Sequence, residues 1–164
     1  MGRNWIPLIA LVLLPLSAIA DDSAPPPGHR EATVTASDTM LGQAQEVALR
    51  ALSFIGVRYK WGGSSPDTGF DCSGLIRYVY SQVTGQSLPY NAREMSGVGT
   101  TVDRAELQPG DLVFFNTLRK PFSHVGIYLG GNRFVHAPSS GKRVRVDTLT
   151  DVYWQKHLVD ARRF

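Results

Sequence analysis

Cys72 is the only cysteine of this 164-residue chain, and it lies in the run GFDCSGLIRYVY. The chain begins like an exported protein, and in that setting a single cysteine has no partner for an internal disulfide. The chemistry that remains for such a residue is the reactivity of its thiol. Cys72 is therefore the first candidate for a nucleophile.

A helix is predicted to begin at Cys72 and to end near Gly85, with Asp71 as its N-cap or first-turn acid. Its apolar positions follow a spacing of three and four: Leu75, Ile76, Val79, Tyr80 and Val83. The unpaired N–H groups of a helix start stabilise a thiolate, and they can also face a substrate carbonyl oxygen as it gains negative charge. We therefore expect a stabilised thiolate at this turn. The alternative, a buried structural cysteine, fits poorly beside the polar Asp71 and Ser73.

A nucleophilic thiol needs an imidazole to accept and return its proton, and that imidazole needs an orienting group. His124 and His136 flank a predicted hairpin whose turn is drawn from residues 130–132. If Tyr128 pairs with Asn132, the two histidines stand opposite each other, and a slip of two residues makes them diagonal neighbours. Both registers allow contact, so we expect an odd number of residues in the loop, with base and orienter at His124 and His136.

A metal site made of Cys72, His124 and His136 is the competing interpretation, since thiolate and imidazole also bind zinc. The sequence has no CxxC, HxH or HExxH spacing, which favours catalysis, and we expect no bound metal. The other two histidines, His29 and His157, are predicted to be surface residues.

Residues 1–20 have the order of a secretory signal peptide: Arg3, an apolar stretch at 6–16, and a small-x-small cleavage site at 18–20. An uncleaved membrane anchor is the alternative, but the apolar stretch is short for a bilayer span. We expect cleavage after Ala20, no stable membrane insertion afterwards, and a periplasmic or secreted product.

Residues 21–38 contain three consecutive prolines among Ser, Thr, Ala and Asp, the composition of a disordered linker. Residues 39–164 are then expected to form a single domain of ordinary size. Without Arg3 the chain has 16 basic and 14 acidic residues, a net charge of +2. Its dense basic patch at 142–145 is predicted to be a solvated edge strand, so we expect no nucleic-acid partner.

Helical patterns precede strand patterns along the domain. The helices are predicted at 41–55, closed by Gly56, at 72–85 and briefly at 91–95, and the strands at 111–115, 124–129, 133–136 and 143–147. A glycine-rich loop at 59–69 holds Trp61, which is expected in the core. This order predicts an α+β domain in which the helix bearing Cys72 packs on an antiparallel sheet.

Four strings extend the pattern around these residues: YKWGGSSPDTGFDCSGLIRYVY, LPYNAREM, LQPGDLVFF and SHVGIYLGGNRFVHAPSSG. In order and spacing they resemble the NlpC/p60 family of bacterial cell-wall cysteine peptidases, over nearly the whole folded part. The resemblance implies a papain-like α+β fold and a Cys-His-His triad. In that triad Cys72 is the nucleophile, His124 the general base and acid, and His136 the orienting member.

The same resemblance implies further residues at the substrate cleft. Tyr59 is expected close to Cys72, where it assists the oxyanion or substrate placement, and Asp71 and Ser73 are expected to line the cleft and bind substrate. From the residues alone, Tyr59 could equally be a packing residue of its loop. Tyr90 departs from the family pattern, since many relatives carry a basic residue after Leu-Pro, and we expect it to affect substrate preference.

The expected function is that of an exported cysteine endopeptidase that cleaves an amide bond in peptidoglycan stem peptides, as a monomer and without a cofactor. Two alternatives remain open. One is an amidase or acyltransferase using the same triad on another substrate. The other is a wall-binding protein whose cleft holds stem peptides without turnover. The bond also stays open, either a link between D-glutamate and a diamino acid or a cross-bridge between stems.

Overall fold

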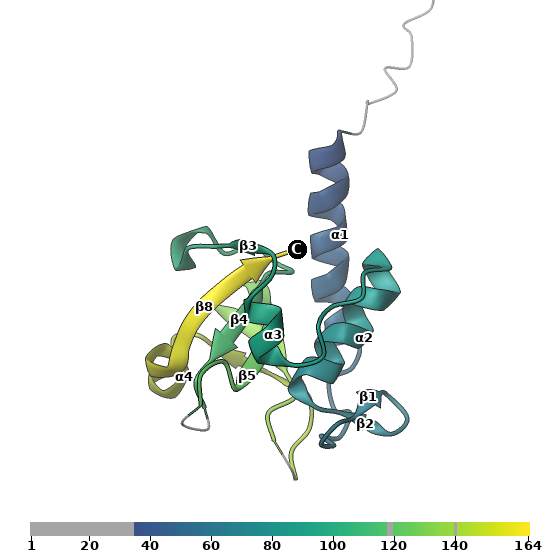
Figure 1. The fold of residues 1–164 in the computed structure, drawn as a ribbon, viewed down its shortest axis with the longest axis vertical. Coiled ribbons are helices and arrows are strands. Elements are labelled where there is room, and N and C mark those ends of the chain that lie inside the picture. Colours follow the sequence, from purple (N-terminus) through teal and green to yellow (C-terminus); the bar gives the residue numbers. More distant parts are fainter. Residues whose placement is uncertain (1–34, 118–119, 140) are drawn as a thin grey trace, which may run out of the picture. The chain divides into compact units, whose positions relative to one another are not determined.

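The computed structural model of this chain describes residues 35–117, 120–139 and 141–164. The signal peptide predicted at 1–20 lies outside the described residues, and so does the predicted linker at 21–38 except for its last four residues. Figure 1 shows the helices and strands that the described residues form.

Three helices precede the larger strands. α1 (Ala36–Leu52) begins inside the range predicted as linker, because Thr35 and Asp38 form a reciprocal capping box that fixes its first turn. The domain start expected at residue 39 is therefore wrong. α2 (Cys72–Thr84) and the short α3 (Ala92–Ser96) lie close to where they were predicted, and a 3-10 turn, η1 (Arg104–Glu106), follows them.

The main sheet has six strands in the order β3-β8-β4-β5-β6-β7, and each neighbouring pair is antiparallel. The strands are β3 (Thr100–Thr101), β4 (Leu112–Phe115), β5 (His124–Gly130), β6 (Arg133–His136), β7 (Arg145–Thr148) and β8 (Leu158–Arg163). A small hairpin, β1 (Ser64–Ser65) and β2 (Gly69–Phe70), lies just before α2. The predicted α+β fold with an antiparallel sheet is confirmed.

The C-terminal segment holds two elements that the sequence patterns did not predict. α4 (Val152–His157) starts at Asp151, whose carboxylate accepts the N–H of Tyr153, and β8 follows at once. β8 inserts between β3 and β4 rather than at an edge of the sheet. Only Ala161 of β8 is fully buried, so its sequence lacks the apolar alternation by which a central strand is recognised.

The sheet is covered on both faces, and Figure 1 shows α1 and α2 together on one side of it. Alternate residues of β4 enter two different cores. Leu112 and Phe114 pack with α1 and α2, whereas Val113 and Phe115 pack with Trp154 of α4. Because both faces are buried, β4 is a continuous apolar run. On the helical side α2 packs against β5, which brings Cys72 to the strand that carries His124.

The hairpin β5–β6 carries both histidines expected to be catalytic. Tyr128 pairs with Phe134 rather than with Asn132, because a β-bulge precedes the turn. Of the two registers that the sequence left open, the structure has the one shifted by two residues. Five residues separate Tyr128 from Phe134, the odd number expected for histidines on one face, but the turn itself leaves only two residues between Gly130 and Arg133, and the bulge makes up the difference. The observed register makes His124 and His136 diagonal neighbours on one face of the sheet.

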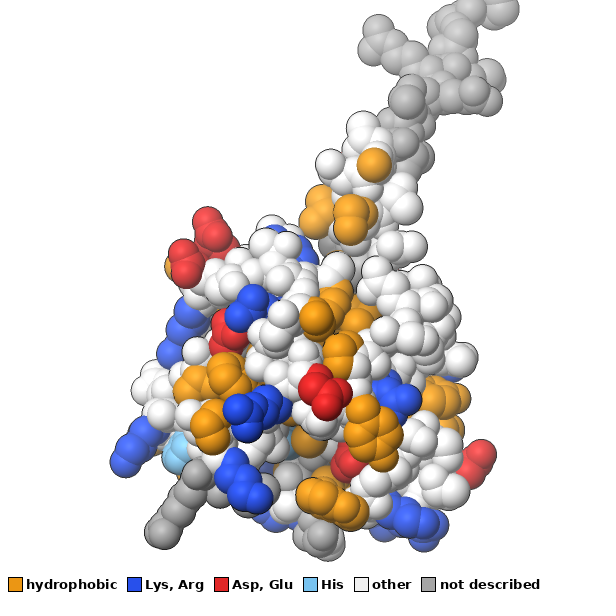
Figure 2. All heavy atoms as spheres, viewed as in Figure 1, with side chains coloured by type: hydrophobic (Ala, Val, Ile, Leu, Met, Phe, Trp, Pro, Cys, Tyr) orange, Lys and Arg blue, Asp and Glu red, His pale blue; other side chains and the backbone are white. Residues whose placement is uncertain are grey.

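The surface of the domain departs from expectation at one aromatic residue. Trp61, expected in the core, is 81% exposed. Of the basic stretch predicted as an edge strand, only Arg145 lies in β7, which is an edge strand; the residues before it pair with the segment 56–59. Lys and Arg side chains on the face in Figure 2 are interspersed with apolar and acidic ones. Within the described ranges, no helix combines the length and apolar character needed to cross a membrane.

Candidate active site

The carboxylate of Asp71 holds Cys72 at the first turn of α2. Its Oδ1 accepts the N–H of Gly74 at 2.7 Å, and its Oδ2 accepts the N–H of Gly62 at 2.9 Å. The prediction of Asp71 as N-cap is confirmed. Because one carboxylate caps the helix and also ties down the glycine-rich loop, the helix start and the loop form one unit.

The same unit depends on a close backbone approach. The carbonyl oxygen of Gly63 accepts the N–H of Asp71 at 3.0 Å, and a Cβ at Gly74 would overlap that oxygen. Only glycine therefore fits at position 74, and the loop lies directly against the first turn of α2.

Cys72 is half-buried, and its resting form is the neutral thiol. Burial, together with the negative charge of Asp71, raises the pKa of Cys72 to about 11. The backbone N–H groups of Val125, Ser73 and Cys72 itself act in the opposite direction but are outweighed. The expectation of a stabilised thiolate is thus wrong for the free protein, and attack by Cys72 requires a base. The contribution of Val125 places the sulfur beside the residue that follows His124.

His124, His136 and Asp147 form a hydrogen-bonded chain. Nε2 of His124 lies 2.7 Å from Nδ1 of His136, and Nε2 of His136 lies 2.9 Å from Oδ2 of Asp147. The three residues come from β5, β6 and β7. The bulge in β5 makes the chain possible, because the two-residue turn by itself would put the histidines on opposite faces of the hairpin.

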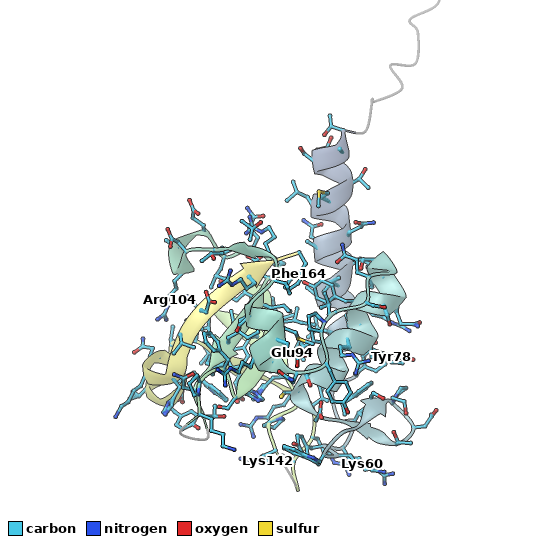
Figure 3. The ribbon with its side chains drawn as sticks, in the orientation of Figure 1. Lys60, Tyr78, Glu94, Arg104, Lys142 and Phe164 are labelled. Atoms are coloured by element: carbon cyan, nitrogen blue, oxygen red, sulfur yellow. The ribbon has the colours of Figure 1, made fainter. Side chains whose placement is uncertain are left out.

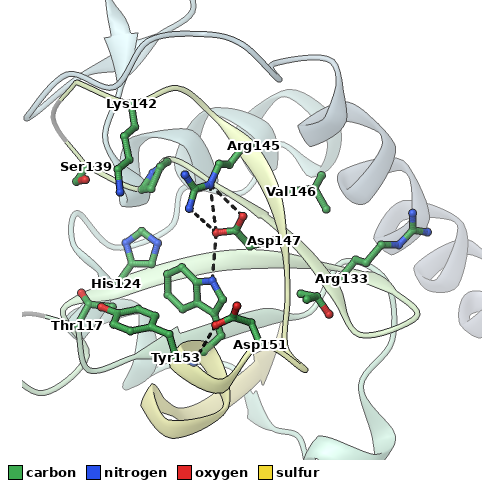
Figure 4. Close-up of a pocket in the computed structure, with 13 residues that line it drawn as sticks. Thr117, His124, Arg133, Ser139, Lys142, Arg145, Val146, Asp147, Asp151 and Tyr153 are labelled. Atoms are coloured by element: carbon green, nitrogen blue, oxygen red, sulfur yellow. Dashed lines mark hydrogen bonds and ion pairs between the residues drawn. The ribbon is translucent and has the colours of Figure 1, made fainter.

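Asp147 is held by two further donors, which Figure 4 shows around it. Nη2 of Arg145 lies 2.7 Å and Nε1 of Trp154 lies 3.1 Å from Oδ2 of Asp147. Burial opposes the charge on Asp147, but hydrogen bonds from His136 and Arg145 hold the pKa of this carboxyl well below its usual range. Asp147 is therefore ionised and can only accept hydrogen bonds.

The ionised carboxylate sets the proton positions along the chain. His136 donates from Nε2 to Asp147, so its Nδ1 is an acceptor. His124 then donates from Nε2 to His136, which leaves Nδ1 of His124 unprotonated. The nitrogen of His124 that lies outside the chain is thus the basic one.

Both imidazoles are neutral in the resting protein. Burial and the neighbouring His136 lower the pKa of His124 to about 3, and burial also lowers the pKa of His136. The carboxylate of Asp147 acts the other way on both rings and favours their protonated forms. The arrangement therefore keeps a neutral base at rest and provides a counter-charge for the imidazolium.

Gly126 gives the two strands room for these rings. A Cβ at Gly126 would lie 2.7 Å from Cδ2 of Phe134, 3.0 Å from the carbonyl oxygen of Val135 and 3.3 Å from Cβ of His136. The missing side chain lets Phe134 and His136 lie across β5. Gly126 is thus part of the packing that sets the histidine geometry, a role that no sequence pattern predicted.

The structure brings Tyr59 into the neighbourhood of Cys72. Burial, then the charges of Cys72 and Asp71, raise the pKa of the Tyr59 hydroxyl. Ser73 is buried, and its hydroxyl donates to Oδ1 of Asp71 at 3.2 Å. Asp71 and Ser73 therefore have structural contacts at the helix start, and their contacts with substrate stay predictions.

The remaining histidines do not join the chain. His29 lies outside the described residues. His157 belongs to α4, where its Nδ1 bonds the carbonyl oxygen of Tyr153 at 2.6 Å. In the part of the chain that the structure describes, no three His, Cys, Asp or Glu side chains are arranged to hold a metal ion.

Asp147 and Trp154 were not among the residues predicted for the site. Asp147 ended a predicted strand, and the alternation of side chains could have placed it on the face of Arg145 and, across the β6–β7 pair, of His136. Trp154 carried no such signal, because α4 was not predicted and its indole reaches Asp147 only in the folded domain.

The site lies in a papain-like α+β domain, with a cysteine at a helix start and histidines on neighbouring strands of an antiparallel sheet. The sequence model of the NlpC/P60 family matches residues 56–163. The chain belongs to the NlpC/P60 family, as the resemblance of its motifs implied.

Two curated relatives and one solved structure illustrate this membership. Murein DD-endopeptidase MepH of Escherichia coli (strain K12) is 44% identical over 125 residues, which are 74% of this chain and 46% of MepH. Gamma-DL-glutamyl hydrolase of Bacillus subtilis (strain 168) is 43% identical over 119 residues, 72% of this chain and 29% of that protein. The structure of the peptidoglycan hydrolase RipB from Mycobacterium tuberculosis matches with a TM-score of 0.64 at 32% identity, covering 76% of this chain and 66% of RipB. The chain thus spans less than half the length of the two curated relatives.

Proposed function

We propose that this protein is a cysteine endopeptidase that hydrolyses an amide bond in the stem peptides of peptidoglycan. The observation that carries the proposal is the chain His124–His136–Asp147, which leaves Nδ1 of His124 basic on the strand whose next residue, Val125, contacts Cys72. The relatives support it, since their names include a murein endopeptidase, a glutamyl hydrolase and a peptidoglycan hydrolase. In this proposal the protein acts as a monomer and uses no metal or cofactor.

His124 is the proposed general base and acid, and His136 its orienting partner. Nδ1 of His124 takes the thiol proton of Cys72 as the sulfur attacks the substrate carbonyl carbon, so the thiolate forms only during attack. The resulting imidazolium is favoured by the carboxylate of Asp147, which acts through His136.

The first turn of α2 is the proposed site of oxyanion stabilisation. The N–H of Cys72 belongs to the unpaired donors of a helix start and faces the developing charge, with Tyr59 nearby. His124 then gives its proton to the leaving amine as the C–N bond breaks, and a thioester remains on Cys72. A water molecule deprotonated by the same ring hydrolyses the thioester and restores the thiol. Asp71 and Ser73 are proposed to line the cleft.

The proposal covers more than one bond of the stem peptide, because MepH is named for a DD bond and the Bacillus subtilis relative for a gamma-DL-glutamyl bond. Peptidoglycan lies outside the cytoplasmic membrane, so the function requires export. The signal peptide predicted at 1–20 is the proposed route, and the product is proposed to be periplasmic or secreted.

Mass spectrometry of soluble fragments from purified peptidoglycan tests the proposal. The protein is expected to release muropeptides whose masses identify the bond, and a folded Cys72→Ala variant is expected to release none. If the folded, reduced protein releases no fragments, the proposal is wrong. Binding to peptidoglycan without release would then favour the wall-binding alternative, and cleavage of other amides or esters would favour the amidase or acyltransferase.

A further inference from the structure

A cavity of about 760 Å³ opens on one side of His124. Figure 4 shows Tyr153 on one side of it and Lys142 on the other. His124 is one of the residues that line this cavity, and Cys72 is not. The cavity therefore borders the proposed base, while the proposed nucleophile is not part of its lining.

Close to His124, the cavity is lined by a positively charged side chain that has no ion-pair partner in the described part of the chain, Lys142. The guanidinium of Arg145 is occupied by Asp147, 2.7 Å away. The ammonium of Lys142, in contrast, has no hydrogen-bond or ion-pair partner among the residues that the structure describes. Figure 4 shows the Lys142 side chain extending toward the side of the cavity where the His124 ring lies.

Backbone pairing, rather than its own side chain, holds Lys142 in this position. The carbonyl oxygen of Lys142 accepts the N–H of Tyr59 at 2.8 Å, and Tyr59 in turn lies near Cys72. Figure 3 shows Lys142 and Lys60, the residue after Tyr59, at the same end of the domain. Lys142 therefore stands at the border between the proposed nucleophile and the cavity.

The charge of Lys142 works against the proposed chemistry unless an anion neutralises it. Burial is the main cause of the lowered pKa of His136, and the charges of Arg145 and Lys142 lower it further. Lys142 thus disfavours the imidazolium that forms next to His136 during attack. A carboxylate bound to Lys142 would cancel this effect and would lie beside His124.

The role of His124 decides which part of the substrate the cavity receives. In the proposed mechanism its protonated ring gives a proton to the leaving amine, so the residue that carries this amine lies beside His124. At a D-glutamyl link or a cross-bridge, that residue is a diamino acid of the stem. Where the diamino acid is dicarboxylic, it also carries a free carboxylate.

We propose that this cavity binds the leaving-side residue of the stem peptide, and that Lys142 binds the free carboxylate of a dicarboxylic diamino acid there. This assignment rests on the proposed function, because it takes the leaving side from the role of His124. It makes Lys142 a specificity-determining residue that favours stems with a free carboxylate over amidated stems.

Binding to a Cys72→Ala protein tests the site without turnover. Two stem peptides are compared by isothermal titration calorimetry, one with the diamino acid carboxylate free and one with it amidated. The free carboxylate is expected to bind about 10-fold more tightly, and Lys142→Gln in the same background is expected to remove this preference. Lys142→Arg should keep most of it, because the charge stays. Lys156→Gln, at an exposed lysine outside the cavity, is the matched control and should leave it unchanged.

The outcomes separate this proposal from the proposed function. Equal affinity for the two peptides, a preference that survives Lys142→Gln, or binding of neither peptide would overturn the assignment of the cavity. A Lys142-dependent preference in a protein whose native form releases nothing from peptidoglycan would overturn hydrolysis and support the site. Release of muropeptides by a protein without this preference would support hydrolysis and overturn the assignment of the cavity.

Discussion

The two parts of the active site are held in different ways. The first part holds Cys72 through contacts within residues 62–74, where the carboxylate of Asp71 caps α2 and ties down the preceding loop. The second part holds His124 through side chains from three strands and α4, in a chain that ends at Asp147 and Trp154. One part is thus local in sequence and built mainly from backbone, while the other is built from side chains far apart in sequence.

This difference assigns a separate physical task to each part. The Cys72 part sets where attack takes place, since the helix start provides the backbone donors that face the substrate oxygen. The His124 part sets where the proton goes, since Asp147 determines which imidazole nitrogen is basic. Steric changes should therefore test packing in both parts, and changes of charge should act mainly through the second.

Removal of either reactive group is expected to have the largest effect. Cys72→Ala and His124→Ala should each slow hydrolysis of peptidoglycan by about 10⁴-fold or more, because nucleophile and base act as a unit. For the same reason the double variant should be no slower than either single one. Release of muropeptides is the measurement, with a thermal melt as the check on folding. Losses that add in the double variant would show that the two parts act independently.

Glycine substitutions compare how tightly the two parts are packed. A Cβ at Gly74 would overlap the carbonyl oxygen of Gly63, which belongs to the backbone. A Cβ at Gly126 would lie 2.7 Å from the Phe134 ring, and a shift of that ring could relieve part of the clash. We expect the free energy of unfolding to fall by about 3 kcal/mol for Gly74→Ala and by about 2 kcal/mol for Gly126→Ala. Chemical denaturation measures both values.

The matched control for these substitutions is Gly42→Ala in α1. Nothing lies within 4 Å of a Cβ built at Gly42, so alanine there should stabilise the domain by about 0.5 to 1 kcal/mol through its higher helix propensity. If Gly74→Ala and Gly42→Ala were equally tolerated, the close approach of the loop to α2 would not constrain the Cys72 part.

Alkylation of Cys72 tests the resting state of the first part. Because its pKa is raised from 9.0 to about 11, the thiolate fraction at neutral pH should be about 100-fold below that of an unperturbed thiol, and the alkylation rate should keep rising above pH 9. Mass spectrometry of iodoacetamide adducts measures this rate cleanly, since the chain has one cysteine. A rate that reaches its plateau below pH 7 would instead indicate a resting thiolate–imidazolium pair.

Asp147→Asn tests whether the far end of the chain matters for the base. We expect kcat to fall by about 10- to 100-fold with little change in KM, because the neutral amide no longer fixes the proton positions on His136 and His124. Arg145→Gln removes one donor to Asp147 but keeps the carboxylate, so kcat should fall less than in Asp147→Asn. Equal losses in kcat for the two variants would argue for a structural role of Asp147. Steady-state kinetics on a soluble stem peptide provides the comparison.

Acid should destabilise the domain through the part that holds His124, and this is the smallest effect that we predict. The pKa of His124 is about 3 in the folded protein against 6.5 for an ordinary histidine, so the unfolded chain binds more protons below pH 6.5 and stability falls as the pH drops toward 3. Between pH 7 and pH 5 the loss should be about 1 to 2 kcal/mol. Asp147 contributes in another window, because its lowered pKa gives stability that is lost only as the pH falls below about 3.8.

Unfolding curves at pH 7 and pH 5 measure this effect. His124→Gln should make the stability less dependent on pH in this range, since the variant lacks the buried imidazole. An unchanged pH dependence in His124→Gln would assign the acid sensitivity to groups outside the chain.

The elements that follow a simple period were predictable, and those that depend on neighbours were not. The spacing of apolar residues indicated α2 and the strands β4 to β6, because each buries a regular set of its own side chains. β8 was not predicted because its sequence lacks the apolar alternation of a central strand, and it is held in the sheet by backbone pairing with β3 and β4. The bulge in β5 escaped for a similar reason, since it alters the face of the histidines without altering their types.

The sequence by itself determined the place of Cys72 at a capped helix start, because Asp71 and Gly74 lie within one turn of it and act through local backbone contacts. It also indicated that His124 and His136 belong to one hairpin, but the bulge that puts them on the same face depends on the folded sheet. Only the tertiary structure decided the protonation of the site. The raised pKa of Cys72 and the basic nitrogen of His124 depend on burial and on Asp147, which the sheet brings together across distant segments.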